Sequence, residues 1–591
     1  MANISHTITG RKVIIRVKRR LCETPDEVVA SELFRDIILR CVRELARKES
    51  PLISFMGTDT PGDREVDTLI QVLSFLSKIP LDLVPNIVRG TEPYVTGRRR
   101  LSDFVEHLYN YWRSFERYVV CDSEGDVLDK RPYRTFNETV EGLTHLIRGL
   151  YREVQEGIQG THPRVYRQVR AGAEISAIAL PYDISLPPGP YRRLNGIPVI
   201  RQVLLNPPLI LEPPMNKRTG AFILVEENPV QRVTIDPQEW LCYPARVGNL
   251  VILVYFHNAF FELGFSLCNL FDIADEEDLA RAPDAIYLFG DPGNGLDGIA
   301  EMPTVFHDDT AHGLLVAAVP NRREYGYFGY LKKMMLTMHN VIQMKRDRLP
   351  FHGALLGIHL KGGRGANVLL MGDTGAGKSE TLEALRTMAG DQIRELVIVA
   401  DDMGSLELRG ESVMGFGSEI GAFLRLDDLS PGFAFGQIDR AIIMSAGRTN
   451  ARIIIPVSDY PTIVAGVRID CVLYANNYED IDADHPVLEQ FSSAEEALKV
   501  FREGTSMSKG TTTSTGLVHS YFANIFGPPQ YRALHEKLAA RFFSAFFREG
   551  LYVGQLRTRL GVRGRETSGP AEAASHLLSL ISSRGGTASS A

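Results

Sequence analysis

The sequence predicts an α/β fold for its C-terminal part, preceded by a mixed α+β part. From residue 350 onward, short apolar runs typical of strands alternate with segments of helical periodicity, which is the pattern of an α/β core. Earlier in the chain, apolar residues recur at helical spacing in some segments and form short β-like runs in others. The helical segments are residues 28–48, 65–79, 101–119 and 137–157, and the β-like runs include 221–225 and 314–319.

The same patterns divide the chain into four segments. Residues 1–215 are helical and mixed, and they end in a proline-rich stretch, 186–216, that we expect to be an irregular connector. Residues 216–320 read as a β-rich second part of the N-terminal region. Residues 321–560 form the predicted α/β core. Residues 561–591 become rich in Gly, Ser and Ala, and we expect a loose tail with at most a short helix.

The composition excludes several classes of protein. Of 591 residues, 44% are hydrophobic and 23% are charged, which is typical of a globular chain. The 65 Lys and Arg against 72 Asp and Glu give a formal charge of −7, which argues against a nucleic-acid partner. The most apolar stretch is uninterrupted only over residues 250–256, so it predicts a buried strand and no membrane partner. Residues 1–10 lack the apolar part of a secretory signal, and the six cysteines have no metal or redox spacing, so we expect a cytoplasmic protein.

A glycine-rich segment, residues 372–379, carries the main functional signal because it fits the pattern G-x-x-x-x-G-K-[ST]. Glycines let such a loop turn tightly, so that successive backbone N–H groups point at a phosphate. Lys378 supplies charge near the β- and γ-phosphates, and the Ser379 hydroxyl can ligate Mg²⁺. The apolar run 367–371 predicts a strand before the loop, and 379–388 predicts a helix whose N-terminus favours anions. The predicted ATP-binding residues are Gly372, Asp373, Thr374, Gly375, Ala376, Gly377, Lys378, Ser379 and Glu380.

A second apolar run, residues 396–400, ends in Asp401 and Asp402. Paired carboxylates at the end of a buried strand, next to a phosphate-binding loop, are the oxygen ligands that a nucleotide-bound divalent cation prefers. Two adjacent carboxylates repel each other unless a cation lies close to them, which favours a metal role for at least one of them.

Residues 320–560 resemble ATP-dependent phosphoenolpyruvate carboxykinase. The match begins with a Y-x-G-x-x-K-K motif at 327–333 and continues with Asn340 and then His352, nineteen residues after Lys333. The glycine-rich loop and the aspartate pair follow in the family's order. A segment resembling the family's N-T-R sequence, residues 449–452, and an aromatic-glycine segment, FANIFG at 522–527, complete the match.

This resemblance implies an enzyme that uses ATP and Mg²⁺ or Mn²⁺ to interconvert oxaloacetate and phosphoenolpyruvate. It implies a metal held by Lys333, His352 and Asp402, with Ser379 serving the metal on the nucleotide. A lysine ligates a metal only as the neutral amine, so the pKa of Lys333 has to be lowered. Lys332, Lys378 and Arg452 would stabilise charge on the transferred phosphoryl group. Tyr327 would lie near the substrate carboxylate or carbon dioxide.

The sequence departs from this family in ways that leave two alternatives open. The loop continues with Glu380 instead of threonine, and G-K-S-E followed by V-A-D-D is closer to HPr kinase/phosphorylase. That resemblance implies a kinase for a protein serine or a small hydroxyl compound, with His352 or Asp401 as the general base. A non-catalytic ATP-binding regulatory protein is the other alternative. The family's substrate-binding arginine has only a weak counterpart in Arg98, within TGRRR at 96–100.

Overall fold

The computed structural model describes residues 4–9, 12–17, 22–58, 60–121, 141–162, 164–166, 175–205, 207–218, 220–373, 375–388, 392–426, 429, 436–509 and 515–584. The contacts divide the chain into two compact units, Met1–Pro163 (unit 1) and Arg164–Ala591 (unit 2). Unit 1 belongs to the predicted N-terminal part, and unit 2 contains the predicted α/β core. This division differs from the four segments expected from the sequence, whose boundaries stay predictions.

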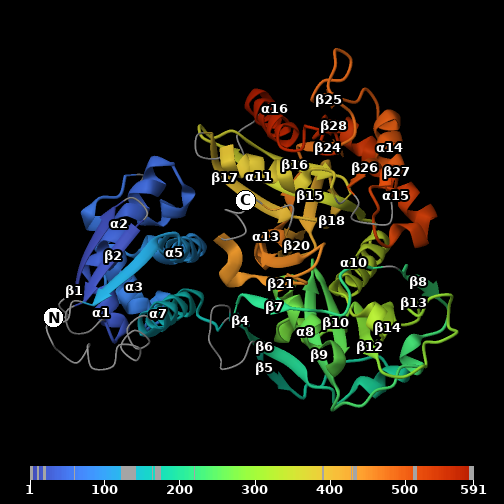
Figure 1. Cartoon of the computed structure of the whole chain (residues 1–591), viewed down its shortest axis with the longest axis horizontal. Helices are drawn as coiled ribbons and strands as arrows, with labels where there is room; N and C mark the ends of the chain where they lie inside the picture. Colours follow the sequence, from blue (N-terminus) through green and yellow to red (C-terminus); the bar gives the residue numbers. More distant parts are fainter. Residues whose placement is uncertain are drawn as a thin grey trace. The chain divides into compact units, whose positions relative to one another are not determined.

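Unit 1 packs helices against a small sheet in the order β1-β2-β3 (Figure 1). Its strands are β1 (Ile4–Thr9), β2 (Lys12–Val17) and β3 (Glu116–Cys121). Its α-helices are α1 (Pro25–Val29), α2 (Glu32–Arg47), α3 (Asp63–Leu76), α4 (Glu92–Thr96), α5 (Arg98–Arg113) and α7 (Gly142–Gln159). Four of these helices confirm the helical periodicity of the sequence. Side chains such as Ile38, Leu69 and Phe104 are completely buried and form the core of the unit.

The first sheet of unit 2 has the order β4-β6-β9-β10-β12-β14-β13-β8, with β5 on β6 and β11 on β9. Its strands are β4 (Val165–Tyr166), β5 (Ile175–Leu180), β6 (Val199–Leu205), β8 (Ile223–Val225), β9 (Trp240–Val247), β10 (Leu250–His257), β11 (Asp272–Ile273), β12 (Ala285–Asp291), β13 (Val305–Asp309) and β14 (Leu314–Pro320). Strand β10 is buried along its whole length, as its continuous apolar run predicts. The expectation of an irregular connector at 186–216 is wrong at β6, because the prolines flank residues 199–205 and do not interrupt them.

The second large sheet has the order β23-β19-β18-β15-β16-β24-β28-β25, with β17 on β15. Its strands are β15 (Leu349–Leu360), β16 (Gly365–Met371), β17 (Ile393–Ala400), β18 (Met403–Arg409), β19 (Ser412–Gly417), β23 (Val467–Arg468), β24 (Cys471–Asn476), β25 (Leu488–Gln490) and β28 (Tyr552–Arg557). Smaller sheets contain β7 (Leu209–Leu211), β20 (Gly421–Arg425), β21 (Ile442–Met444) and β22 (Arg452–Pro456), and β26 (Thr505–Lys509) with β27 (Thr515–His519). Mixed helices and strands confirm the general α/β class.

Helix α10 (Phe328–Lys345) contacts strands of both large sheets, and nearly all of its residues are buried (Figure 1). A helix that is apolar around its whole circumference belongs in a core. The other α-helices of unit 2 are α8 (Phe261–Phe265), α9 (Glu276–Leu279), α11 (Lys378–Met388), α13 (Tyr460–Ala465), α14 (Ala494–Glu503), α15 (Arg532–Arg548) and α16 (Ser568–Arg584). Helix α16 packs on α11 through Ala574 and Leu578, in a region expected to be a loose tail.

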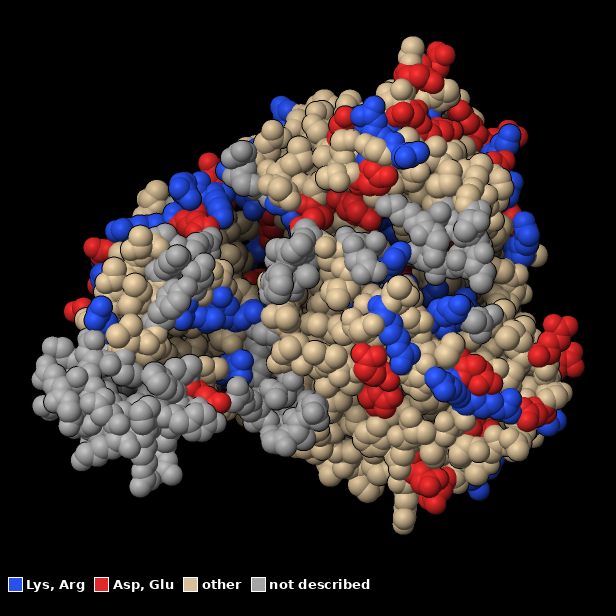
Figure 2. Space-filling model, in the orientation of Figure 1, with Lys and Arg blue, Asp and Glu red and all other residues tan. Residues whose placement is uncertain are grey.

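The surface agrees with the nearly balanced charges of the sequence. On the face that Figure 2 shows, Lys and Arg side chains are interspersed with Asp and Glu side chains among the described residues. Within the described part of the chain, no helix combines the length and the apolar character needed to cross a bilayer.

Candidate active site

The glycine-rich loop lies where the sequence predicts it, between strand β16 and helix α11. Gly375 and Gly377 have φ of +80° and +92°, a conformation that residues with a Cβ rarely adopt. A Cβ at Gly377 would also lie 2.5 Å from Oγ1 of Thr558. The loop therefore needs glycine at this position for both conformation and space. Thr374, which the sequence also assigns to this loop, lies outside the described residues.

Two side chains that follow neighbouring strands hold the loop in place. The Asn477 amide donates to the carbonyl oxygen of Gly375 at 2.8 Å, and the Thr558 hydroxyl donates to that of Ala376 at 2.7 Å. Strands β16, β24 and β28 run parallel, so their carboxyl ends meet at one edge of the sheet. That edge is where open α/β sheets bind ligands. Lys378 Nζ donates to the carbonyl oxygens of Gly372 at 2.5 Å and Asp373 at 3.1 Å, so its charge stays at the loop.

The aspartate pair lies at the same edge of the sheet. Strand β15 pairs antiparallel with both β16 and β17, which brings the ends of these two strands to the same side. His352 on β15 therefore lies between the loop and the pair, and its Nε2 is 2.9 Å from Oδ1 of Asp402. Burial, and then the charge of Asp402, raises the pKa of Asp401 to about 6. Burial opposes ionisation of Asp402 too, but Lys332 and His352 outweigh it and hold the pKa of Asp402 well below its usual range.

The second contact of His352 limits what can lie between the ring and Asp402. Its Nδ1 donates to the carbonyl oxygen of Ala523, so a hydrogen bond from Nε2 to Asp402 requires a second proton on the ring. Without that proton, a cation between Nε2 and Oδ1 would relieve the repulsion of two electron-rich atoms at 2.9 Å. Ala523 belongs to Phe522–Asn524, whose residues all have positive φ, of 44°, 57° and 61°. Such conformations cost about 1–2 kcal/mol per residue and tend to occur at functional sites.

Helix α10 contributes the lysine pair. Lys332 is 2% exposed, and its Nζ lies 2.8 Å from Oδ2 of Asp402 and 3.3 Å from Oε1 of Glu419. Burial disfavours its charge, but these two carboxylates outweigh burial and raise the pKa of Lys332. Lys333 differs, because burial and the nearby charge of Arg218 lower its pKa to about 8. Its Nζ lies 4.7 Å from the centre of the Phe526 ring.

Glu419 is a buried carboxylate that the sequence reasoning missed. Its side chain is fully buried, and Oε2 has no hydrogen-bond partner among the described residues. Burial raises the pKa of Glu419 to about 8, although Lys332 opposes the rise. Glu419 is a single charged residue within the otherwise apolar and glycine-rich run 413–424, which is the signal that could have drawn attention to it.

The wall opposite the loop comes from the small sheet of β20 and β22. Arg425 and Arg452 are register partners on these strands, and the Arg452 guanidinium lies 5.4 Å from the centre of the Phe423 ring. Phe423 also contacts Tyr327, the residue before α10, with ring centres 6.2 Å apart. Burial raises the pKa of Tyr327 although Arg452 and Lys332 oppose it, so its phenol stays protonated at neutral pH and can donate a hydrogen bond.

A further arginine lies near this wall. Arg218 donates to the carbonyl oxygen of Gly220 at 2.6 Å, and its guanidinium lies 5.0 Å from the centre of the Phe222 ring. No carboxylate pairs with it in the part of the chain that the structure describes. Burial lowers the pKa of Arg218, and its charge in turn lowers that of Lys333. A half-buried cation that no acidic side chain pairs with favours an anionic ligand beside it.

Most of the residues predicted from the sequence line one cavity. Its empty space, counted out to the solvent at the mouth, is about 840 Å³, within the usual range for small-molecule sites. The lining residues are Tyr327, Lys332, Lys333, Asp373, Gly375, Lys378, Ser379, Glu380, Asp401, Asp402, Phe423, Leu424, Arg425, Leu429 and Arg452. His352 adjoins the cavity through Asp402. Gly372, Ala376 and Gly377 shape the loop and are not among the lining residues.

Arg98 lies in unit 1, and its guanidinium contacts groups of that unit. It forms an ion pair with Asp82 and donates to the carbonyl oxygen of Ile158. These contacts give Arg98 a role in packing α5 against its neighbours. They do not support the role in substrate binding that the sequence weakly suggests.

The donor set allows a metal ion but does not form a complete cage. Among the described residues, no group of three or more His, Cys, Asp or Glu side chains is arranged to hold a metal. The cavity offers two such ligands, His352 and Asp402, at the close Nε2–Oδ1 contact that a cation would relieve. Lys333, with its lowered pKa, provides an amine nearby. A neutral amine of Lys333 beside His352 and Asp402 would complete the set of three ligands that the resemblance to the carboxykinase family implies.

Comparisons with known proteins add no family to this description of the site. The sequence matches no protein-family model and no curated protein sequence.

Proposed function

We propose that the chain is an ATP- and divalent-metal-dependent phosphoryl-transfer enzyme with a carboxykinase-like nucleotide-binding core, acting on oxaloacetate and phosphoenolpyruvate. One observation carries this proposal: six separate parts of the sequence converge on one cavity with the charges that the reaction needs. These parts are the start of α10, His352 near the start of β15, the glycine-rich loop, the aspartate pair after β17, the start of β22 and residues 522–527. The order and spacing of the same parts carry the resemblance to the carboxykinase family.

In this proposal the nucleotide binds through the loop. The backbone N–H groups of the loop and the N-terminus of α11 hold the β- and γ-phosphates, and Lys378 moves from the loop carbonyls to the phosphate oxygens. A divalent metal, when bound, would neutralise charge on the phosphates and on the enolate oxygen. Ser379, Asp402, His352 and Lys333 are the residues that would hold metal ions here.

The cationic wall would act on the acceptor. Oxaloacetate carries two carboxylates, and Arg452, Arg425 and the protonated Tyr327 provide donors for them along one side of the cavity. Loss of carbon dioxide leaves an enolate whose oxygen attacks the γ-phosphorus as ADP leaves. Lys332, kept charged chiefly by Asp402, would stabilise the equatorial phosphoryl oxygens during this transfer.

The direct test is an assay of the purified protein with phosphoenolpyruvate, bicarbonate and ADP, with Mn²⁺ and Mg²⁺ tested separately, following oxaloacetate. We expect the wild-type protein to form oxaloacetate and the Lys333→Ala variant to form none. A matched control is Lys345→Ala on the same helix, because Lys345 pairs with Asp308 away from the cavity. ATP binding without oxaloacetate formation under any of these conditions would refute the carboxykinase assignment.

One observation favours a second candidate function, a kinase for a hydroxyl acceptor of the HPr kinase type. Asp401 lines the cavity with a pKa raised to about 6, so it is mostly ionised at neutral pH yet basic enough to accept a hydroxyl proton. Glu380, which sets this loop apart from that of the carboxykinases, also lines the cavity. Two results together would favour this candidate. The protein would transfer labelled γ-phosphate to a protein serine, with the transfer lost in Asp401→Asn, and the oxaloacetate assay would be negative.

A further inference from the structure

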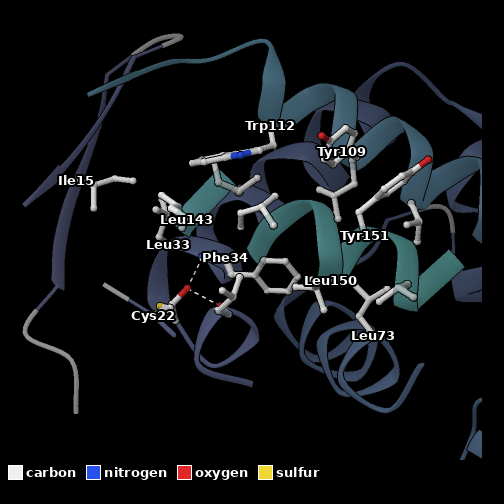
Figure 3. A pocket seen from close by; sticks show the side chains of 17 residues that line it. Ile15, Cys22, Leu33, Phe34, Leu73, Tyr109, Trp112, Leu143, Leu150 and Tyr151 are labelled. Atoms are coloured by element: carbon white, nitrogen blue, oxygen red, sulfur yellow. Dashed lines mark hydrogen bonds between the residues drawn. The ribbon is translucent and has the colours of Figure 1, made fainter. Parts of the chain in front are cut away.

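Unit 1 contains a second cavity that the proposed reaction does not use. It encloses about 960 Å³ of empty space, counted out to the solvent at its mouth. Helices α2, α5 and α7 supply most of its walls, Leu73 of α3 closes one side, and Ile15 of β2 closes another (Figure 3). All of these elements belong to one compact unit, so the cavity is a feature of that unit alone.

The lining of this cavity is almost entirely apolar. Among the described residues that line it, none carries a charged side chain. The hydroxyl of Ser31 is already used, because it donates to the carbonyl oxygen of Val28 at 2.6 Å and accepts from the backbone of Phe34 at 3.2 Å. The Tyr151 hydroxyl donates to Glu106, and its ring stacks on Tyr109 with centres 4.4 Å apart. An ordered water needs two to four polar partners, which this lining does not offer.

The shape of the cavity selects among apolar ligands. Its wall on α7 runs from Leu143 to Val154, and at 1.5 Å per residue this is a length of about 16 Å. That length is about half the hydrocarbon thickness of a bilayer, which is roughly 30 Å, and so it matches one acyl chain. Leu33, Cys22 and Leu143 lie at one end of the cavity, and Leu73 and Leu150 lie toward the other (Figure 3). Leu33 and Leu143 are only half-buried, so we place the mouth at their end.

We propose that this cavity binds one aliphatic chain of acyl-chain length, with the chain buried between α2, α5 and α7 and its head group at the Leu33 end. The chain is recognised by burial of hydrocarbon surface, which is the dominant favourable term for such a ligand. A free fatty acid and a neutral lipid share this chemistry. A free fatty acid and a neutral lipid differ in their head group, whereas the residues that line the cavity recognise only the hydrocarbon chain.

The test uses Trp112, whose indole forms part of the cavity wall (Figure 3). The chain has two tryptophans, and the other, Trp240, is buried in unit 2. In the full-length Trp240→Phe protein, the remaining fluorescence therefore reports on the cavity. The probes are ω-bromoundecanol and ω-bromoundecanoate, because bromine quenches an indole that it contacts.

We expect saturable quenching by the alcohol, by the acid or by both, and the head group that binds more tightly identifies the source. Shortening the chain by two methylenes should raise Kd by about 15-fold if the chain is buried. Leu143→Arg places a charge at the mouth and should abolish quenching. Leu146→Arg, on the same helix and equally half-buried but outside the cavity lining, should leave quenching unchanged.

Val154→Phe provides a second variant, because it fills the inner end of the cavity without adding charge. It should raise Kd for the undecyl probes more than for shorter ones. Circular dichroism confirms the fold of each variant. Absence of saturable quenching by either probe would overturn the proposal, as would equal quenching in Leu143→Arg and Leu146→Arg. Neither result bears on oxaloacetate formation, so this inference stands or falls independently of the proposed function.

Discussion

Replacing Glu419 by glutamine should make the protein more stable at alkaline pH. The side chain is fully buried beside Lys332, and burial raises the pKa of Glu419 from 4.5 to about 8. A carboxyl whose pKa is raised on folding stabilises the folded state at low pH, and that contribution is lost as pH rises through the folded-state pKa. Glutamine keeps the shape of the side chain and cannot ionise, so the variant escapes this loss.

The size of the effect follows from the two pKa values. Each pKa unit corresponds to about 1.4 kcal/mol, so ionising Glu419 between pH 4.5 and about 8 costs the wild type about 5 kcal/mol. With an unfolding entropy of about 2.1 cal/mol/K per residue over the roughly 430 residues of unit 2, this is a midpoint shift of about 5 °C. The shift should develop between about pH 5 and pH 9, since this is the range over which the group titrates.

The assay is thermal unfolding followed by circular dichroism at several pH values. The control is Glu411→Gln, because Glu411 is exposed in the turn between β18 and β19. We expect the midpoint of Glu419→Gln to exceed that of wild type at about pH 9 and to approach it near pH 5, whereas Glu411→Gln follows wild type throughout. A constant difference at all pH values would show that Glu419 does not titrate in this range, and the reasoning would be refuted.

Three further substitutions test other contacts of the cavity. Lys332→Met should destabilise the protein by about 3–5 kcal/mol, because it removes the buried cation 2.8 Å from Asp402, and an unchanged unfolding midpoint would contradict this. Thr558→Val removes the hydrogen bond to the carbonyl oxygen of Ala376 and should weaken ADP binding by about fivefold, measured by titration calorimetry. Unchanged affinity would argue against a role of Thr558 in holding the glycine-rich loop. Arg218→Ala should raise KM for phosphoenolpyruvate by about tenfold or more with little change in kcat, and a loss of kcat alone would contradict a binding role.

The parts of the site that could be predicted from the sequence are those that short segments specify. The strand, loop and helix around Lys378 follow from apolar runs and glycines that are adjacent in the chain, and the structure confirms these elements. The same holds for strand β17 before Asp401, and for the helical segments of unit 1. Local propensity and periodicity were sufficient there because tertiary contacts agree with them.

The remaining residues of the site depend on which strands pair in three dimensions. Phe423 and Arg425 line the cavity because β20 pairs with β22, and no local pattern specifies that pairing. Glu419 lies just before β20, buried beside Lys332. The expected connector did not include strand β6, because Arg201 and Gln202 interrupt its apolar residues and prolines flank it. Arg218 precedes β8 in sequence and has no motif around it. Its significance appears only in three dimensions, where no acidic partner pairs with it among the described residues.

The most direct test of the central claim separates nucleotide binding from turnover in three variants. ADP and ATP affinity and oxaloacetate formation would be measured in parallel for Lys378→Ala, Lys333→Ala and His352→Ala. Because the loop carries Lys378 while Lys333 and His352 face the aspartate pair, we predict that only Lys378→Ala loses nucleotide affinity. All three should lose turnover. Loss of nucleotide affinity in Lys333→Ala or His352→Ala to the degree seen in Lys378→Ala would contradict the account.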